Sequence, residues 1–426
     1  KGRRTENLLS FTIDRVGYVV IRFSKDQDFT KRLVIFVEPP EVLPQGEIIN
    51  ITTEYAVDNT GQSNETLKIQ KALDDISGTD KVLLFPAGLY KSSMLEIKSN
   101  SKIHLSKGAR IIADASDLDS YKAKNGGGIN HFILIDGAHD VEITGLGILD
   151  GNGTEILGVA DPDRAKAMGG MRLLFMLNAK RISFDGIVLK DPAGWNTHMM
   201  GCDDVSFRNC KMINSAINNY YFGSLDGWDP DASQRVLIEN CFGWAGDDNV
   251  AIKCTGYGDH DVYNNVEDIT VRSCVFLTRK TSLKIGTETR CESMKRIIFE
   301  DNDVIEADRV MGINVRDRAT VEDVVYRNIR SEFYFPDRRQ MPINFYITKR
   351  EKDQNWSGRI RNIRVENCSF EQMFPKKMQF TRGVSFTNEE DFQVSISNLI
   401  IDDEVVDYLD PRFFNLNKCN GVIKFK

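Results

Sequence analysis

The sequence predicts an all-β protein, a single-stranded right-handed parallel β-helix, and two repeating patterns indicate this fold. A hexamer of alternating apolar and polar residues, rich in Val, Ile and Phe, starts at residues 141, 182, 205, 236, 269, 297, 324 and 363. A second series of strand-like segments, offset from the first, starts at residues 226, 248, 281, 311 and 341. Such alternation is typical of strands with one buried face. The hairpin turns that a β-sandwich or propeller needs about every 8–12 residues are mostly missing.

The chain before the repeats has a different character. Residues 1–45 contain strand-like runs and then a proline-containing linker, which predicts a small N-terminal β-domain or β-cap. Residues 46–426 are assigned to the β-helix. Residues 64–76 show the pattern of an amphipathic helix, with Leu67, Ile69, Ala72, Leu73 and Ile76 on its apolar side. We expect this helix to cap the open end of the β-helix, because an exposed sheet edge invites aggregation.

Composition narrows the class of protein. The formal net charge of −7 disfavours a nucleic-acid binder, which normally carries a basic surplus. No apolar run reaches the roughly 18 residues that span a bilayer, so we expect no membrane span. Cys/His spacings typical of zinc sites are missing as well. One position of the repeat is occupied by Cys210, Cys241, Cys274 and Cys368, which predicts an interior ladder of small apolar side chains in place of disulfides.

The segment from residue 224 to residue 256 is rich in carboxylates, at Asp226, Asp229, Asp231, Asp247 and Asp248. Asp226 and Asp248 hold the same place in adjacent units, and neighbouring coils stack about 4.8 Å apart. In a regular strand, Asp247 and Asp248 would point to opposite faces, so we expect a bend that turns both outward. The coils should therefore gather Asp226, Asp247 and Asp248 into one exposed cluster.

Three carboxyl groups this close cannot all ionise near neutral pH, and at least one should keep its proton. A protonated acid beside an ionised carboxylate is the equipment for breaking a glycosidic bond, since one group protonates the leaving oxygen and the other activates water or attacks the sugar. The alternative is a calcium site or a solvated acidic face. The segment at residues 229–233 does not follow an EF-hand loop.

Side chains that should project outward around this cluster form a predicted substrate-binding set. Strand alternation turns cations outward on three successive coils, where they could bind acidic groups of a substrate or serve as counter-charges for the aspartates. An aromatic ring and a histidine on the preceding coil could stack on a sugar and hydrogen-bond to it, or pack structurally. The full set is Lys253, Lys284, Asn314, Arg316, Trp195, His198, Asp229 and Thr281.

After about residue 60 the sequence resembles glycoside hydrolase family 28, the polygalacturonase-like enzymes of the pectin-lyase-like β-helix superfamily. The resemblance rests on residues 83–113, on GLGILDGNG at 145–153, and on SLDGWDPDASQRVLIENC followed by GDDNVAIK. It implies a right-handed parallel β-helix and hydrolysis with inversion, with no metal or organic cofactor. By the same resemblance Asp247 is the general acid, and Asp226 and Asp248 activate the water.

The sequence departs from the family pattern at three places. Ser224-Leu225 stand where the family has Asn-Thr, and Thr281 stands where its Gly-His-Gly motif has the histidine. Residues 314–316, Asn-Val-Arg, replace its Arg-Ile-Lys motif and keep a cation only at Arg316. Because those basic groups hold galacturonate in the polygalacturonases, the expected substrate is a complex polysaccharide or oligosaccharide, with acidic, pectin-like glycans among the options.

Other functions fit the same architecture. They are an α-glucan hydrolase like the family 49 dextranases and isopullulanases, a calcium-dependent polysaccharide lyase, and a non-catalytic glycan-binding β-helix. We expect a monomer that is secreted or periplasmic, because it must meet a glycan substrate. Insertions near residues 123–130, 157–170 and 255–264 favour a pocket closed at its ends and exo action.

Overall fold

The computed structural model describes residues 3–5, 8–21, 32–116, 118–121, 129–158, 170–214, 225–256, 262–334, 341–350, 358–371, 378–382, 392–417 and 423–426. It contains two compact units, Lys1–Val42 and Leu43–Lys426. In the first unit, β1 (Arg3–Thr5) pairs antiparallel with β2 (Leu8–Ser10), and β3 (Gly17–Ile21) with β4 (Leu33–Val37). That this unit is an independent domain stays a prediction.

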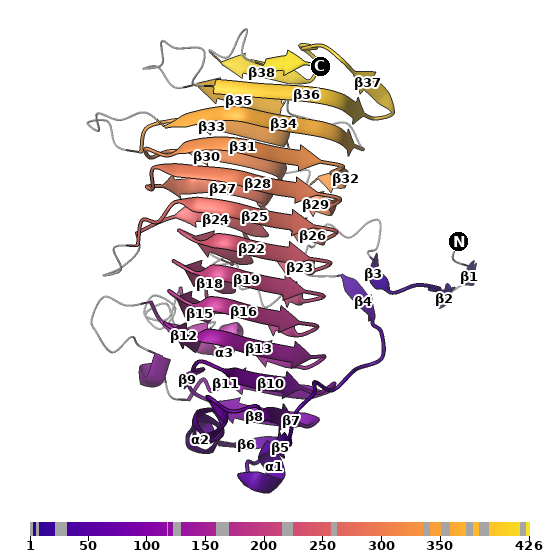
Figure 1. Cartoon of the computed structure of the whole chain (residues 1–426). Helices are drawn as coiled ribbons and strands as arrows, with labels where there is room; N and C mark the ends of the chain where they lie inside the picture. Colours follow the sequence, from indigo (N-terminus) through magenta and orange to yellow (C-terminus); the bar gives the residue numbers. More distant parts are fainter. Residues whose placement is uncertain are drawn as a thin grey trace. The chain divides into compact units, whose positions relative to one another are not determined.

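The second unit is a parallel β-helix, as predicted, and Figure 1 shows its coils stacked along one axis. Each regular coil contributes three strands, one more than the sequence patterns indicated. The first two strands of each coil belong to a 24-stranded sheet, which we call the large sheet. The third belongs to an eleven-stranded sheet, which we call the site sheet.

The strands of the large sheet fall into two series with the following bounds. The first is β5 (Ile48–Asn50), β7 (Val82–Phe85), β10 (Ser101–Leu105), β13 (His139–Gly145), β16 (Lys180–Asp185), β19 (Asp203–Arg208), β22 (Gln234–Glu239), β25 (Val266–Arg272), β28 (Ser293–Glu300), β31 (Thr320–Arg327), β34 (Arg359–Phe370), β36 (Phe392–Ile401), β37 (Glu404–Val406) and β39 (Ile423–Phe425). The second is β6 (Thr60–Asn64), β8 (Gly88–Ser92), β11 (Ala109–Ala113), β14 (Ile148–Asp150), β17 (Val188–Lys190), β20 (Lys211–Ile213), β23 (Phe242–Ala245), β26 (Val275–Thr278), β29 (Asp303–Ala307) and β32 (Arg330–Tyr334).

The site sheet runs the length of the β-helix with one strand from each coil. Its strands are β9 (Leu95–Glu96), β12 (His131–Asp136), β15 (Arg172–Leu177), β18 (Thr197–Met200), β21 (Trp228–Asp231), β24 (Val250–Cys254), β27 (Thr281–Thr289), β30 (Arg309–Val315), β33 (Met341–Ile347), β35 (Met378–Arg382) and β38 (Phe414–Asn417). All of its pairings are parallel.

Short helices accompany the strands: α1 (Ile51–Glu54), α2 (Thr66–Ile76), a 3₁₀ turn at Leu118–Tyr121 and α3 (Gly153–Leu157). Helix α2 lies at the N-terminal end of the coil stack, packed against β7, β9 and β10 (Figure 1), so the predicted cap is present. It buries Ile69, Ala72, Leu73 and Ile76 as expected. Leu67 was predicted on the same face but is 86% exposed, because at about 100° per residue it projects from the side of the helix opposite Ile69 and Ile76.

The turn between the first two strands of a coil is built on left-handed backbone. Asn209, Asn240 and Asn328 have φ of 52°, 51° and 54°, a conformation that asparagine tolerates better than most residues. Their side chains bridge coils: the Asn240 amide donates to Asn209 at 2.6 Å, and that of Asn328 to Asp301 at 2.8 Å. These turns hold the coils in register.

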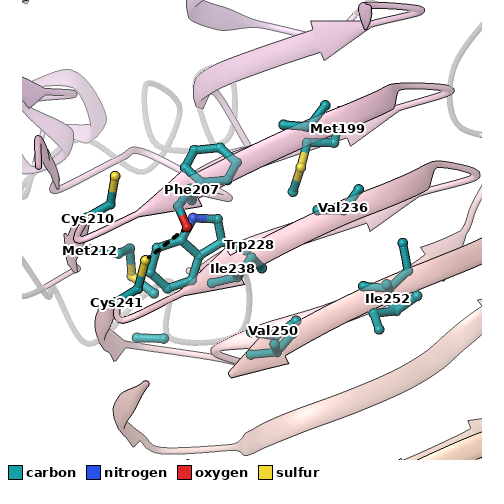
Figure 2. Packing of buried hydrophobic residues seen from close by; sticks show 14 of the residues in the cluster. Met199, Phe207, Cys210, Met212, Trp228, Val236, Ile238, Cys241, Val250 and Ile252 are labelled. Carbon is teal, nitrogen blue, oxygen red and sulfur yellow. Dashed lines mark hydrogen bonds between the residues drawn. The ribbon is translucent and has the colours of Figure 1, made fainter. Parts of the chain in front are cut away.

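The interior is one continuous apolar core (Figure 2), and the predicted cysteine ladder lies within it. Cys210, Cys241 and Cys274 are buried free thiols on successive coils, with the Cys241 backbone N–H 3.4 Å from the Cys274 sulfur. Cys368 is also buried and free, as predicted. Cys419 lies outside the described residues. Burial suits thiols that pack as small apolar groups.

Candidate active site

The register of the site sheet brings the predicted acidic residues together. Trp228 pairs with Val250, an offset of 22 residues that sets Asp226 beside Asp248 on the next coil, as the sequence predicted. Strand β23 ends at Ala245, the backbone bends, and β24 begins at Val250. Carboxylate oxygens of Asp226, Asp247 and Asp248 all lie within 4.8 Å of one another. The predicted bend and the predicted cluster are therefore both present.

The cluster is less accessible than expected. Asp226 is 5% and Asp248 2% exposed, whereas Asp247 is half-buried. The expectation of one exposed cluster was wrong in this respect, because lysine side chains from neighbouring strands cover two of the carboxylates. Asp247 is thus the most accessible of the three.

Two buried lysines pair with the aspartates. The Lys253 ammonium lies 2.5 Å from an oxygen of Asp226 and 2.7 Å from one of Asp229. Lys284 lies 2.5 Å from Asp248. Both cations act as counter-charges in the structure, which is one of the two roles that the sequence left open. Their binding of an acidic substrate stays a prediction.

The environment drives the pKa values of the neighbouring carboxyls apart. Burial, followed by repulsion from Asp226 and Asp248, raises the pKa of Asp247 to about 8. Burial also acts to raise the pKa of Asp248, but the charge and hydrogen bond of Lys284 outweigh it and hold that pKa below its ordinary value. Opposed shifts of this kind distinguish an acid from a base at a catalytic site. Asp247 keeps its proton near neutral pH while Asp248 remains ionised.

A buried hydrogen-bonded chain lies under the cluster. The Arg172 Nε donates to His198 Nδ1 at 3.4 Å, and His198 Nε2 donates to Asp231 at 2.9 Å. The Thr255 backbone N–H also donates to Asp231, at 2.8 Å. Burial lowers the pKa of His198 to about 4, so its ring is neutral and the two bonds define its tautomer. Burial raises the pKa of Asp231, but the hydrogen bonds from His198 and Thr255 lower it by more.

Trp195 connects this chain with the cluster. The Lys253 ammonium lies 3.5 Å and the Arg172 guanidinium 4.0 Å from the centroid of its ring, and the His198 ring meets it edge-on at 4.9 Å. Cations over an indole face are attracted by its quadrupole. The ring is half-buried and supports two cations, so its stacking on a sugar stays a prediction.

The remaining members of the predicted substrate-binding set lie at different depths. His198 and Asp229 have no exposed surface, and their direct contact with substrate stays untested. Thr281 is 1% exposed, and its backbone N–H donates to Asp248 at 2.9 Å. Asn314 is buried, with its amide 3.3 Å from the Asn344 carbonyl.

Arg316 follows β30 and is half-buried. It lies beyond the coil that carries Thr281 in the direction of the C-terminus. Ser224 lies outside the described residues, as do most of the predicted wall insertions, at residues 122–128, 159–169 and 257–261.

Sequence reasoning missed Arg309. Arg309 is the strand-pairing partner of Thr281, which is itself level with Asp248 on the preceding coil. The positive charge of Arg309 adds to that of Lys284 in lowering the pKa of Asp248. The repeat itself could have found this residue, because Arg309 precedes Met311 by the same two positions that separate Asp248 from Val250. Lys280 was missed too, and it acts on Asp247.

The carboxyl cluster is a poor metal site. Asp226, Asp247 and Asp248 form the one group in the described part of the chain with three acidic, histidine or cysteine ligands close enough to share an ion. A divalent cation needs several ionised oxygens that are free to coordinate. Here Lys253 and Lys284 already contact two of the carboxylates and the third holds a proton, so we assign no metal to the cluster.

Fold and site together define a class: a parallel β-helix protein with a cluster of three carboxyl groups, one with a raised and one with a lowered pKa. Residues 77–333, more than half of the chain, match glycosyl hydrolases family 28. The chain belongs to this family.

Individual relatives are more distant. The sequence is 24% identical over 267 residues to a probable endo-xylogalacturonan hydrolase A of Aspergillus fumigatus, an alignment that covers 61% of this chain and 62% of that protein. The fold is similar to the polygalacturonase of Erwinia carotovora, with a TM-score of 0.68, 18% identity, and coverage of 92% of this chain and 99% of that one. It is also similar to the family 28 exopolygalacturonase of Yersinia enterocolitica. There the TM-score is 0.65 and the identity 15%, with coverage of 93% of this chain and 80% of that one. At such identities the two structures show the fold alone.

Proposed function

We propose that the protein is an inverting hydrolase of O-glycosidic bonds in an acidic, pectin-type polysaccharide or oligosaccharide. The observation that carries the proposal is the cluster of three carboxyl groups within 4.8 Å, of which one has its pKa raised to about 8 and another has its pKa lowered. A protonated acid and an ionised base side by side are what glycoside hydrolysis requires.

In the proposed mechanism Asp247 donates its proton to the leaving glycosidic oxygen. Its partial exposure suits this role, because the acid must reach the substrate. Asp226 and Asp248 hold one water and accept a proton from it as its oxygen attacks the anomeric carbon. Lys253 lies 2.5 Å from Asp226, and Lys284, 2.5 Å from Asp248, stabilises the ionised form of that carboxylate. The bond to the leaving oxygen breaks as the bond to the water oxygen forms.

The separation of the carboxyl groups bears directly on the proposed inversion at the anomeric carbon. Inverting enzymes usually separate their carboxyl groups by about 6.5–9.5 Å to admit a water, whereas retaining enzymes use about 5–5.5 Å. The closest oxygens of this cluster lie within 4.8 Å. We propose inversion because two carboxylates, Asp226 and Asp248, are each paired with a lysine and so available as a joint base. Proton NMR of the first product formed distinguishes the outcomes, and a retained anomer overturns inversion.

The pectin-type substrate is proposed from sequence similarity and charge. The curated relative from Aspergillus fumigatus is named for xylogalacturonan, an acidic glycan. Lys253 and Lys284 contact aspartates, so an acidic sugar must find other cations. Arg309, Lys280 and Arg316 are half-buried on the C-terminal side of the cluster and supply positive charge there. We propose that an acidic group of the substrate lies on that side. The protein would then act outside the cytoplasm, secreted or in the periplasm.

A panel of glycans tests the proposal. The protein is incubated with polygalacturonan, xylogalacturonan, dextran and a carrageenan, and new reducing ends and product sizes are measured. We expect release from an acidic pectic glycan without added metal. Cleavage of dextran alone would replace the pectic assignment with an α-glucan one. A product absorbing in the ultraviolet, lost on chelation, would indicate a lyase and overturn hydrolysis.

A further inference from the structure

Asp229 is a buried carboxyl group that the proposed mechanism does not use. It has no exposed surface, and in the described part of the chain Lys253 is the one group that donates a hydrogen bond to it. Its one ion-pair contact is with the Lys253 ammonium at 2.7 Å. An ionised carboxylate offers about four acceptor positions, and leaving them unfilled in a dry interior is costly.

Lys253 cannot neutralise Asp229 and Asp226 at once. Its ammonium is 2.5 Å from Asp226 and 2.7 Å from Asp229, so a single positive charge faces two carboxyl groups. The other ammonium of the cluster, on Lys284, is paired with Asp248. Three carboxyl groups thus contact two ammonium groups, which favours two protons among the four carboxyls when Asp247 is counted. Asp247 carries one of them.

The surroundings decide where the second proton lies. Asp226 retains 5% exposure and contacts Lys253 at the shorter distance, whereas Asp229 is fully enclosed. The charged groups that act on Asp229 are Lys253, Asp226 and, farther away, Arg172; His198, its pairing partner in β18, is neutral. Burial raises the pKa of Asp229 well above its ordinary value, and the positive charge of Lys253 does not offset this.

We propose that Asp229 is a positioning residue that stays protonated beneath the site and, with the Trp195 ring, holds the Lys253 ammonium against Asp226. This rests on the proposed function, in which Asp226 shares the activation of water. Trp195 contributes its ring face at 3.5 Å from the ammonium, and Asp229 a neutral oxygen at 2.7 Å. The charge of Lys253 is then directed at Asp226, the nearer of its two carboxyl contacts.

Three variants test the proposal. Asp229→Leu removes the oxygen that orients Lys253, so kcat/KM should fall about tenfold. The acid side of the pH profile of kcat/KM should shift to higher pH by about one unit. Both changes correspond to the loss of about one charged hydrogen bond. Asp229→Asn has the shape and charge of the protonated acid and should rescue both quantities. Lys253→Met should lower kcat further than Asp229→Leu, because it removes the charge itself.

A second readout needs no substrate. In infrared spectra at neutral pH, the wild-type protein minus Asp229→Asn should show the C=O band of a protonated carboxylic acid, with the band of Asp247 cancelling. An absent difference band overturns the proposal. The proposal is also overturned if the acid side of the pH profile of kcat/KM lies at lower pH in Asp229→Asn than in the wild-type protein. That result would mean that an ionised Asp229 had been competing with Asp226 for Lys253. If no glycan is cleaved, the proposed function fails, and the infrared comparison still decides whether Asp229 holds a proton.

Discussion

On the large sheet, Arg296 and Asp268 form an ion pair at 2.6 Å with side chains 45% and 43% exposed; on the site sheet, Lys253 and Asp226 form one at 2.5 Å with side chains 4% and 7% exposed. The two distances are nearly equal, and the surroundings are not. Water screens the first pair, whose contribution to stability is small. The second pair has lost its hydration, and its members depend on each other.

The same contrast appears in whole strands. In β25 of the large sheet, buried residues alternate with accessible ones, whereas every residue of β24 in the site sheet is buried. The pKa of one carboxyl from each sheet shows the consequence. The hydrogen bond from Arg296 lowers the pKa of Asp268, and burial raises that of Asp247. Charge on the large sheet keeps the surface solvated, and charge on the site sheet is buried and paired, as the proposed proton transfer requires.

The largest expected effect comes from removing the proton donor. Asp247→Asn should lower kcat about 10²–10⁴-fold, the usual contribution of a general acid. The far-ultraviolet circular dichroism spectrum should not change. The matched control is Asp204→Asn on the large sheet, an exposed residue with φ of 60° that asparagine tolerates. Full activity of Asp247→Asn would remove the acid role from that residue.

Next in size is the loss of a buried counter-charge. Lys284→Met leaves Asp248 buried without its partner, which should cost about 3–5 kcal/mol in the free energy of unfolding. Arg296→Met breaks a solvated pair and should leave the midpoint of denaturant unfolding within measurement error. Equal destabilisation by the two variants would mean that the sheets do not differ in the way proposed.

The pH profile of activity should reflect the raised pKa of the acid. As the pH rises above about 8, Asp247 loses its proton and kcat/KM should fall about tenfold per pH unit. Initial rates on the cleaved glycan across the alkaline range measure this. A rate that stays level well above pH 8 would contradict the assignment.

The smallest expected effect is on the pH dependence of stability, and its sign should differ between the sheets. Because the pKa of Asp247 is raised on folding from its ordinary value of 3.8 to about 8, its contribution is complete below about pH 4 and is lost as the pH rises through 8. Asp247→Asn should remove that decline. The pKa of Asp268 is lowered on folding, so its contribution is present above the unfolded pKa and lost in acid. Asp268→Asn should weaken stability only above that unfolded pKa, as denaturant titrations at several pH values would show.

Much of the fold could be predicted because it is a local and repetitive property. Val141, Ile182 and Val205 occur at one phase of the hexamer and are paired partners on successive strands. The second strand of each coil escaped prediction, since segments such as β14 and β17 have three residues each and leave almost no pattern. Leu67 was misplaced because it is two positions from Ile69, about 200° around the helix, and therefore lies on the opposite side from the buried residues.

The candidate site divides along the same line. The sequence alone determined that Asp226 and Asp248 would be neighbours, because a repeat in register converts an interval of 22 residues into adjacency across coils. Only the tertiary structure decided which charges are buried and which groups face them. It placed the Lys253 ammonium between Asp226 and Asp229, and it brought the charge of Arg309 to bear on Asp248. Burial and pairing depend on groups that meet from several coils at once, and the pKa of each carboxyl follows from that meeting.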